Sequence, residues 1–204
     1  MFFSVIRGYN ALLAKYPCTT KTVTAGALAA AGDVFVQINS KEDGEKESSG
    51  GIVKRATAGD RQADPLQTTV SYETFDVKRF VGFTIFGSIW SGYLNHYWFD
   101  WLAKTFAHHT PVKALAYKTL CQHGLLNPFL YIPAFFLSQG WWLGKSWEET
   151  KETASRSYVA TLSSCYLFWI PATSAQFLWI PLRYQVLYGS TLSFFWNVFL
   201  ALQD

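Results

Sequence analysis

Two stretches of this chain, between Lys118 and Lys145 and between Arg156 and Arg183, contain no Asp, Glu, Lys or Arg. Each is about 26 residues long, whereas a membrane-spanning helix needs about 20 predominantly apolar residues. Each is bounded by a basic residue and carries aromatic side chains near its ends, as expected at the level of lipid head groups. The first prediction is therefore that this chain lies in a bilayer.

The composition agrees with a membrane protein and excludes several other classes. Half of the residues are hydrophobic and 15% are charged, against about 25% charged in a typical soluble domain. The net charge of +3 and the lack of a basic cluster argue against a nucleic-acid partner. Cys18, Cys121 and Cys165 fit neither a metal-ligand spacing nor an even disulfide framework. We expect no metal and no disulfide.

The apolar windows predict an all-α fold. They are residues 22–40, 80–99, the two charge-free stretches and residues 184–203. Pro181 is expected to end the fourth window, because proline lacks a backbone donor and disfavours helix in the residue before it. We predict a polytopic membrane helix bundle of about four transmembrane helices, with an amphipathic N-terminal segment and a membrane-embedded C-terminal helix.

The chain is predicted to be a single domain, residues 1–204, with one polar insertion. Residues 41–69 are rich in charge, Gly, Ser and Ala, so we expect a disordered loop there. Residues 145–156 place Glu148 and Glu152 four positions apart and predict a short amphipathic helix on the membrane surface. The basic residues of the N-terminal tail and of the loop after the second apolar window predict that both face the compartment that positive charge prefers, which in a mitochondrion is the matrix.

Asp33 is the most informative single residue, because an acid within a membrane span is unfavourable by about 2.5–3.5 kcal/mol and is by default functional. Gln37 lies four residues later, on the same helix face. Three interpretations are open: both side chains line a water path, Asp33 is a buried acid paired with a residue of another helix, or Asp33 lies close enough to the membrane interface to be solvated. His96 and Arg79 are the first candidates for a partner. The small residues around Gly26 predict a close contact with a second helix.

No catalytic site can be assembled from the sequence, and an enzyme is not expected. Ser163 and Ser164 have no partnered histidine nearby, and no phosphate-binding glycine loop is present. His96 and His123 lie in neighbouring windows and fit haem ligation, but ordinary hydrogen bonds between helices explain them better. We predict no catalytic residue and no cofactor beyond a bound phospholipid of the cardiolipin type.

Several motifs occur in an informative order: Gly32-Asp33 with Gln37, residues 92–99 with His96-Tyr97-Trp98 at their centre, residues 169–181, and residues 196–200. This ordered set resembles one membrane protein family, that of the 22-kilodalton peroxisomal membrane protein and its Mpv-type mitochondrial relatives. The resemblance covers nearly the whole chain. It implies a helix bundle in the mitochondrial inner membrane or the peroxisomal membrane.

This chain departs from the family mainly at polar positions. Trp169-Ile170 stands where the family has Trp-Pro, and Thr173 and Gln176 stand where the family has Gln and Asn. The arginine that the family carries after Pro181 is replaced by Gln185, and the insertion at 41–69 is longer than usual. The conserved part consists chiefly of small and aromatic residues that determine packing.

Two functional hypotheses follow. The first is a structural accessory subunit of a large mitochondrial inner-membrane complex, a respiratory complex or ATP synthase, with protein subunits and lipids as partners. The drifted polar motifs and the insertion favour it. The alternative, which the resemblance implies, is a small pore or metabolite channel of the mitochondrial inner or peroxisomal membrane. Its candidate pore or buried polar residues are Asp33, Gln37, His96 and Gln176.

Overall fold

The computed structural model describes residues 2–50 and 75–201, and all regular structure in these residues is helical. The elements are α1 (Phe2–Lys15), α2 (Pro17–Gly50), α3 (Val77–Phe86), η1 (Gly87–Leu94), α4 (Asn95–Thr105), α5 (Pro111–Leu120), η2 (Cys121–Tyr131), α6 (Ile132–Trp142), α7 (Trp147–Trp179), η3 (Leu182–Tyr184) and α8 (Gln185–Ala201). The segments η1 and η2 are π-helical, and η3 is a 3₁₀ turn. The predicted all-α fold is confirmed.

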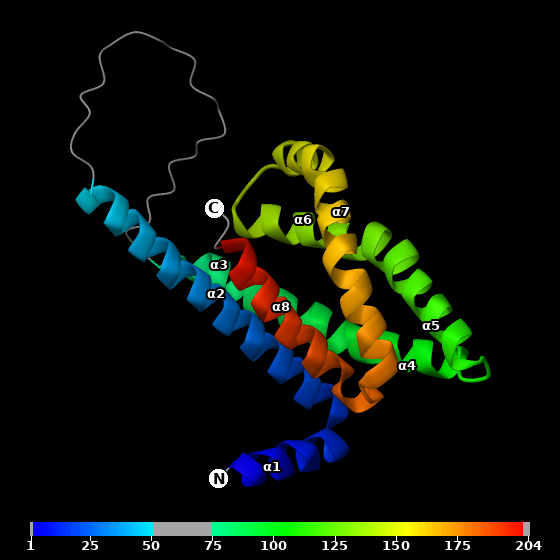
Figure 1. The fold of residues 1–204 in the computed structure, drawn as a ribbon. Helices are drawn as coiled ribbons and strands as arrows, with labels where there is room; N and C mark the ends of the chain where they lie inside the picture. Colours follow the sequence, from blue (N-terminus) through cyan, green and yellow to red (C-terminus); the bar gives the residue numbers. More distant parts are fainter. Residues whose placement is uncertain (1, 51–74, 202–204) are drawn as a thin grey trace.

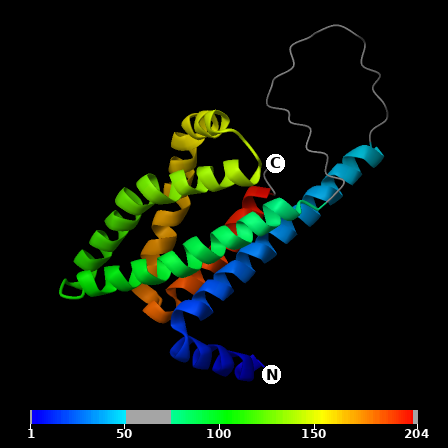
Figure 2. The same ribbon diagram turned by 180° about the vertical axis from the view of Figure 1, so that it is seen from behind.

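Two of the helical runs are continuous through their π-helical segments. The first contains α3, η1 and α4, and the second contains α5, η2 and α6 (Figures 1 and 2). Taken one at a time, none of the helices in residues 2–50 and 75–201 is both long enough and apolar enough to pass through a membrane. The predicted membrane crossings therefore stay a prediction.

The centre of the bundle is the contact of α2 with η1 and α8, which lie along it in both ribbon views (Figures 1 and 2). A Cβ added at Gly26 would lie 2.1 Å from the Ser88 Oγ atom, and one at Gly92 would lie 2.4 Å from the Thr22 Cα atom. Because only hydrogen fits at these positions, the helix backbones approach closely. The predicted contact of the small-residue face around Gly26 is confirmed.

Proline and a capping box set the bounds of α7. The Ser146 hydroxyl accepts from the Glu149 N–H, and the Glu149 carboxylate accepts from the Ser146 N–H. At the other end, Ile180 is extended and Pro181 begins the turn into α8, as predicted (Figure 1). Residues 147–156 are helical as predicted, but the prediction of a short helix was wrong: no glycine or proline lies within residues 145–156, and α7 continues from Trp147 to Trp179.

The N-terminal segment forms helix α1, which lies at an angle to α2 (Figure 1). A hydrogen bond of 2.6 Å from the Tyr184 hydroxyl to the Asn10 Oδ1 atom joins α1 to the turn before α8. The predicted polar loop begins later than expected, because α2 continues to Gly50 through a segment rich in Lys and Glu, which are good helix formers. The rest of that predicted loop, residues 51–69, lies outside the described residues.

The distribution of polarity is inverted relative to a soluble domain. Among the described residues, eleven buried side chains are polar or charged and nine are apolar. Large apolar side chains are exposed along the outer faces, including Phe129 at 70%, Leu167 at 83% and Trp179 at 75%. Buried side chains in water-soluble proteins are mostly apolar, so this molecule is expected to face an apolar medium on its outside.

Candidate functional site

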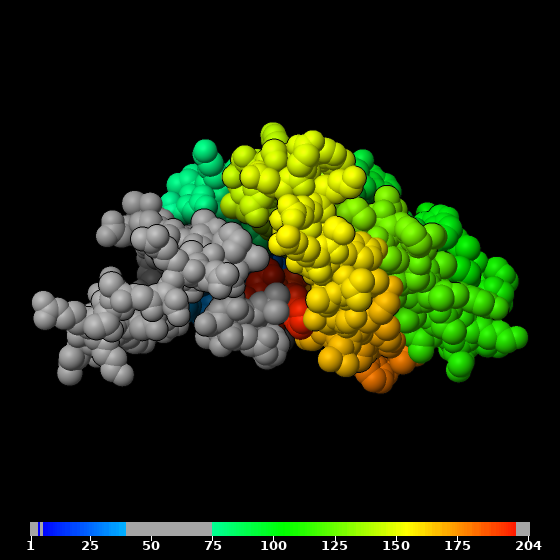
Figure 3. All heavy atoms as spheres, turned by 90° about the horizontal axis from the view of Figure 1, so that it is seen from above, coloured from blue at the N-terminus to red at the C-terminus, as the bar shows by residue number. Residues whose placement is uncertain are grey.

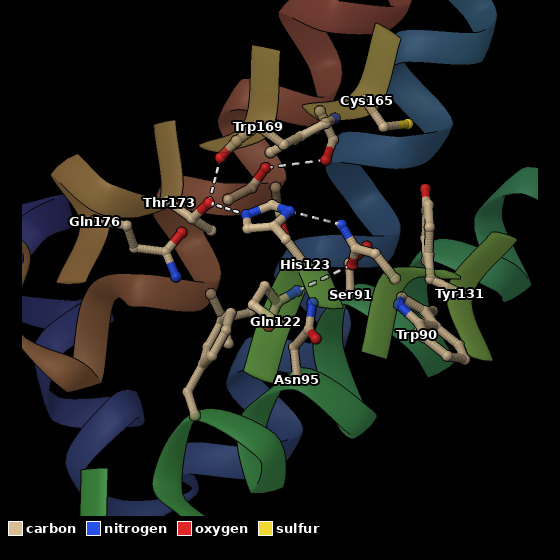
Figure 4. A pocket seen from close by; sticks show the side chains of 16 residues that line it. Trp90, Ser91, Asn95, Gln122, His123, Tyr131, Cys165, Trp169, Thr173 and Gln176 are labelled. Atoms are coloured by element: carbon tan, nitrogen blue, oxygen red, sulfur yellow. Dashed lines mark hydrogen bonds between the residues drawn. The ribbon is translucent and has the colours of Figure 1, made fainter. Parts of the chain in front are cut away.

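A polar cavity of about 70 Å³ lies where both continuous helical runs meet α7 and α8 (Figure 4). We call it the polar cavity. Its walls are formed by residues of η1 and α4 (Trp90, Ser91, Asn95, Phe99), of η2 (Gln122, His123, Asn127, Tyr131), of α7 (Cys165, Trp169, Thr173, Gln176) and of α8 (Val186, Gly189, Ser190, Ser193). None of these residues carries a formal charge at neutral pH. The volume is large enough for about five water molecules.

One wall of the polar cavity is a chain of hydrogen bonds that all run in the same direction. The Trp98 indole N–H donates to the Gln122 Oε1 atom at 2.6 Å, and the Gln122 amide donates to the Asn127 Oδ1 atom at 3.3 Å. The Asn127 amide nitrogen lies 3.1 Å from the His123 Nδ1 atom. Because this amide can only donate, His123 Nδ1 accepts and the imidazole proton sits on Nε2.

The chain then continues into α7. The His123 Nε2–H donates to the Thr173 hydroxyl at 2.6 Å, and Thr173 donates to the carbonyl of Trp169 (Figure 4). Both ring nitrogens of His123 are therefore used, which leaves neither for the haem ligation considered from the sequence. Every member is satisfied, so this wall is rigid, and a rigid neutral wall fixes the positions of the remaining polar groups.

The polar cavity is also lined by hydrogen-bonding atoms that have no partner. They are the Gln176 Nε2, the Asn95 Oδ1 and the Ser190 Oγ atoms, all three shielded from solvent. Gln176 and Ser190 are buried, at 2% and 4% exposure. An unpaired buried polar atom is unfavourable by about 1–3 kcal/mol. A donor, an acceptor and a hydroxyl left unpaired around one cavity indicate a site built for a polar occupant.

A second, larger cavity adjoins the first. Its volume is about 370 Å³, and its own lining is mainly aromatic and small: Phe83, Phe86, Phe135, Phe194, Ala25 and Ala29 are among the residues. We call it the aromatic cavity. The two cavities share walls at Ser91, Tyr131, Cys165, Trp169, Ser190 and Ser193. Seen from above, the end of α8 is recessed beside α7 (Figure 3).

Two of the predicted site residues, Asp33 and Gln37, lie outside both cavities. The Asp33 carboxylate is buried, accepts from the Arg79 Nε atom at 2.8 Å and accepts from the Gln37 amide at 2.6 Å. Gln37 also bonds both backbone groups of Asp76, at 3.2 and 2.8 Å. Together these contacts join α2 to the start of α3. Of the two predicted partners of Asp33, Arg79 is correct.

His96 was expected beside Asp33 and instead contacts Lys21. The Lys21 Nζ atom lies 3.0 Å from the His96 Nδ1 atom, and Lys21 is only 3% exposed. Burial lowers the pKa of Lys21, and the neighbouring Asp100 partly offsets that shift. His96 fails to reach Asp33 because it lies far along the helical run from Arg79, at the other end of η1.

Gln176 is the predicted site residue that does lie in the polar cavity. The sequence reasoning did not select its neighbours Gln122, Asn127 and Ser190. A signal for them exists: Gln122, His123 and Asn127 interrupt an otherwise apolar, charge-free stretch, and His123 and Asn127 lie four residues apart. Within the described chain, no three His, Cys, Asp or Glu side chains are grouped as metal ligands.

Comparison with known proteins confirms the resemblance suggested by the motifs. The model of the Mpv17 / PMP22 family matches residues 140–201. Protein sym1 of Schizosaccharomyces pombe is 26% identical over 211 residues, covering 100% of this chain and 93% of the relative. The mitochondrial inner membrane protein Mpv17 of Danio rerio is 27% identical, covering 96% and 94% of the two chains.

A peroxisomal relative is similar over nearly the same length. Peroxisomal membrane protein 2 of Bos taurus is 22% identical, covering 95% of this chain and 86% of the relative. The two compartments predicted from the sequence are thus those in the names of these relatives. No solved structure matches the chain.

Proposed function

We propose that this chain, a divergent member of the Mpv17/PMP22 family, is an integral membrane protein that conducts small uncharged polar solutes through the polar cavity of its helix bundle. The mitochondrial inner membrane is the proposed location, with the peroxisomal membrane as the alternative. The observation that carries the proposal is the polar cavity itself. Its four walls come from four different helical runs, carry no charge and present three unpaired hydrogen-bonding atoms.

The outside of the bundle supports a location in the bilayer. In each of the two continuous runs the α-helical residues, 10 and 11 of them, alone span about 32 Å at about 1.5 Å per residue, whereas a bilayer core is about 30 Å thick. Residues 80–99 and 119–144 of these runs contain no charged side chain. Exposed apolar side chains on the outer faces would be in contact with lipid tails.

An uncharged lining favours neutral solutes over ions. An ion entering a cavity without a counter-charge loses its hydration with nothing to replace it, whereas a polyol or an amide exchanges hydrogen bonds with water for bonds with the protein. Glycerol and urea are therefore the test solutes, and chloride is the charged control.

Gly189 offers a direct test, because its added Cβ would meet only the Gln176 Oε1 atom at 3.5 Å. Gly189→Leu is therefore tolerated by the backbone and projects its side chain into the polar cavity. The control is Gly8→Leu, at a helix position where an added Cβ meets nothing within 4 Å. In proteoliposomes followed by stopped-flow light scattering, we expect Gly189→Leu to lower glycerol flux about fivefold or more while Gly8→Leu leaves it unchanged. Equal glycerol flux in wild type and Gly189→Leu, or chloride flux as fast as glycerol flux, would contradict the proposal.

The sequence favoured the accessory-subunit role because of the drifted polar motifs and the insertion at residues 41–69, and residues 51–69 of that insertion lie outside the described residues. It stays a prediction, and the polar cavity now favours the solute pathway over it. A native gel in mild detergent separates the two. Migration of the chain in a megadalton band with respiratory subunits would support the accessory role.

A further inference from the structure

The solute pathway leaves the aromatic cavity without a role. A cavity of about 370 Å³ lies within the range of about 300–1,000 Å³ that small-molecule sites occupy. Its walls include Phe86, Phe135 and Phe194, which suit hydrocarbon rather than a polyol. A small polar solute would gain little there, so a different ligand is needed to explain this space.

Several residues border both the polar cavity and the aromatic cavity. Tyr131, Trp169 and Ser190 border both cavities, so the two spaces adjoin at these three side chains. The Tyr131 ring packs against Phe86 and Trp90, with ring centres 6.0 and 5.4 Å away. A molecule with an apolar body and a small polar head therefore suits these adjoining spaces, with its body in the aromatic cavity and its head in the polar cavity.

The head group is specified by what the polar cavity offers and what it lacks. The unpaired Gln176 Nε2 donor, Asn95 Oδ1 acceptor and Ser190 hydroxyl match a group that both donates and accepts, which a hydroxyl does. Among the described residues, no Lys, Arg, Asp or Glu lines either cavity, so a phosphate would be buried there without a counter-charge. The cardiolipin predicted from the sequence therefore does not fit this site.

We propose that the joined cavities bind an uncharged lipid with hydroxyl groups in its head, of the monoacylglycerol type. Its glycerol head occupies the polar cavity between Gln176, Asn95 and Ser190, and its acyl chain occupies the aromatic cavity. This ligand goes beyond the proposed transport, because a lipid so bound occupies the solute pathway and closes it.

Binding is tested on the purified full chain in dodecyl maltoside with radiolabelled 1-oleoylglycerol. The matched probe is 1-oleoyl-lysophosphatidate, which has the same tail and differs by one phosphate. We expect saturable binding of one oleoylglycerol per chain and binding of the lysophosphatidate weaker by about tenfold or more, because the phosphate has no counter-charge. Free glycerol at millimolar concentration is expected not to displace the lipid.

Three variants locate the site. Gln176→Leu removes the unpaired donor in the polar cavity, and Thr161→Phe fills only the aromatic cavity. Each is expected to weaken oleoylglycerol binding by about tenfold. The control is Ser163→Phe, which places the same ring on the exposed face of α7, away from both cavities, and is expected to bind as wild type does. Circular dichroism and gel filtration identify a variant that fails to fold, in which case Thr161→Leu replaces Thr161→Phe.

Absence of saturable binding, equal binding of the lysophosphatidate, displacement by free glycerol, or wild-type binding by Thr161→Phe would each overturn the proposal. Lipid binding is measured without transport, so the proposed lipid site and the proposed solute pathway can be refuted independently. Oleoylglycerol binding with unchanged glycerol flux in Gly189→Leu removes only the solute pathway. Reduced flux in Gly189→Leu without lipid binding removes only the lipid site.

Discussion

Two tyrosine hydroxyls of α7 compensate for the donors that prolines in the second helical run lack, and this compensation can be measured. In a π-helix each N–H bonds to the carbonyl five residues earlier, as the Ile132 N–H does to Asn127. Pro128 has no N–H, so the carbonyl of His123, five residues before it, has no backbone donor in this pattern. The Tyr166 hydroxyl donates to this carbonyl at 2.6 Å.

A second proline of the same helical run is also matched by a tyrosine hydroxyl of α7. Pro133 lies five residues after Pro128 and leaves the Pro128 carbonyl without its donor. The Tyr158 hydroxyl donates to the Pro128 carbonyl at 2.6 Å. Two independent matches of proline, carbonyl and tyrosine indicate that α7 is positioned partly by the backbone groups that the prolines free.

The perturbation is Tyr166→Phe, which keeps the ring and removes the hydroxyl. A buried carbonyl left unpaired is unfavourable by about 1–3 kcal/mol, and hydrogen bonds between helices in membranes average about 0.6 kcal/mol. Because the Tyr166 bond is only partly buried, we expect a loss of about 1 kcal/mol in the free energy of unfolding. Tyr117→Phe, on an exposed side chain, is the control and is expected to change it by less than about 0.5 kcal/mol.

The decisive measurement is a double-mutant cycle in mixed dodecyl maltoside–SDS micelles, followed by circular dichroism. Pro128→Ala restores an N–H, so the carbonyl of His123 regains a backbone donor. In that background Tyr166→Phe is expected to lose almost nothing, which gives a coupling energy of about 1 kcal/mol between the two positions. If Tyr166→Phe loses the same stability with and without Pro128, the reasoning is refuted.

Three further predictions concern stability. Gly92→Ala is expected to lower the free energy of unfolding by about 1–3 kcal/mol, because the added Cβ would lie 2.4 Å from the backbone of α2. Gly8→Ala, whose Cβ meets nothing within 4 Å, is expected to raise it by up to about 1 kcal/mol. Unfolding by SDS titration compares the two variants. Arg79→Ala leaves buried Asp33 without its cation and is expected to lose about 2 kcal/mol, since Arg79 is itself partly exposed, and Asp33→Asn is expected to lose less. The hydrogen bond from the backbone N–H of Ser146 lowers the pKa of Glu149 in the folded protein. Ionised Glu149 therefore stabilises the fold above the ordinary pKa of 4.5, and this stabilisation is lost as the pH falls through the lower pKa of the folded state. Glu149→Gln is expected to flatten that part of the curve of unfolding free energy against pH.

Features that follow from the chemistry of a single residue were predictable. The end of the fourth apolar window at Pro181 follows from proline's missing donor, and the close contact at Gly26 follows from residue size. The pairing of Asp33 with Arg79 was also within reach, because a buried acid requires a cation and few are available near that window. Each of these inferences needed only local chemistry.

The polar cavity was not predictable in the same way. Gln176 was selected because of the family resemblance, while Asn95 and Ser190 lie on other helical runs and share no sequence pattern with it. What makes them a site is that all three are left unpaired around one space, which is a property of the packed bundle. His96 was predicted as a partner of Asp33 because an imidazole can bond a carboxylate. Its position along the helical run is too far from Asp33, and it contacts Lys21 instead.

The irregular backbone explains why the bundle encloses any space at all. Both π-helical segments, Gly87–Leu94 and Cys121–Tyr131, line the polar cavity and the aromatic cavity, and π-helical turns occur frequently at functional sites. A π-turn contains more residues than an α-turn, so it changes which side chains face inward without breaking the helix. In η2 the turn brings Gln122, His123 and Asn127 into one hydrogen-bonded wall. Pro128 lies within η2 and has no N–H, so it can complete neither an α-helical nor a π-helical hydrogen bond. The residue that makes regular helix unfavourable in η2 is therefore also one on which the polar lining depends.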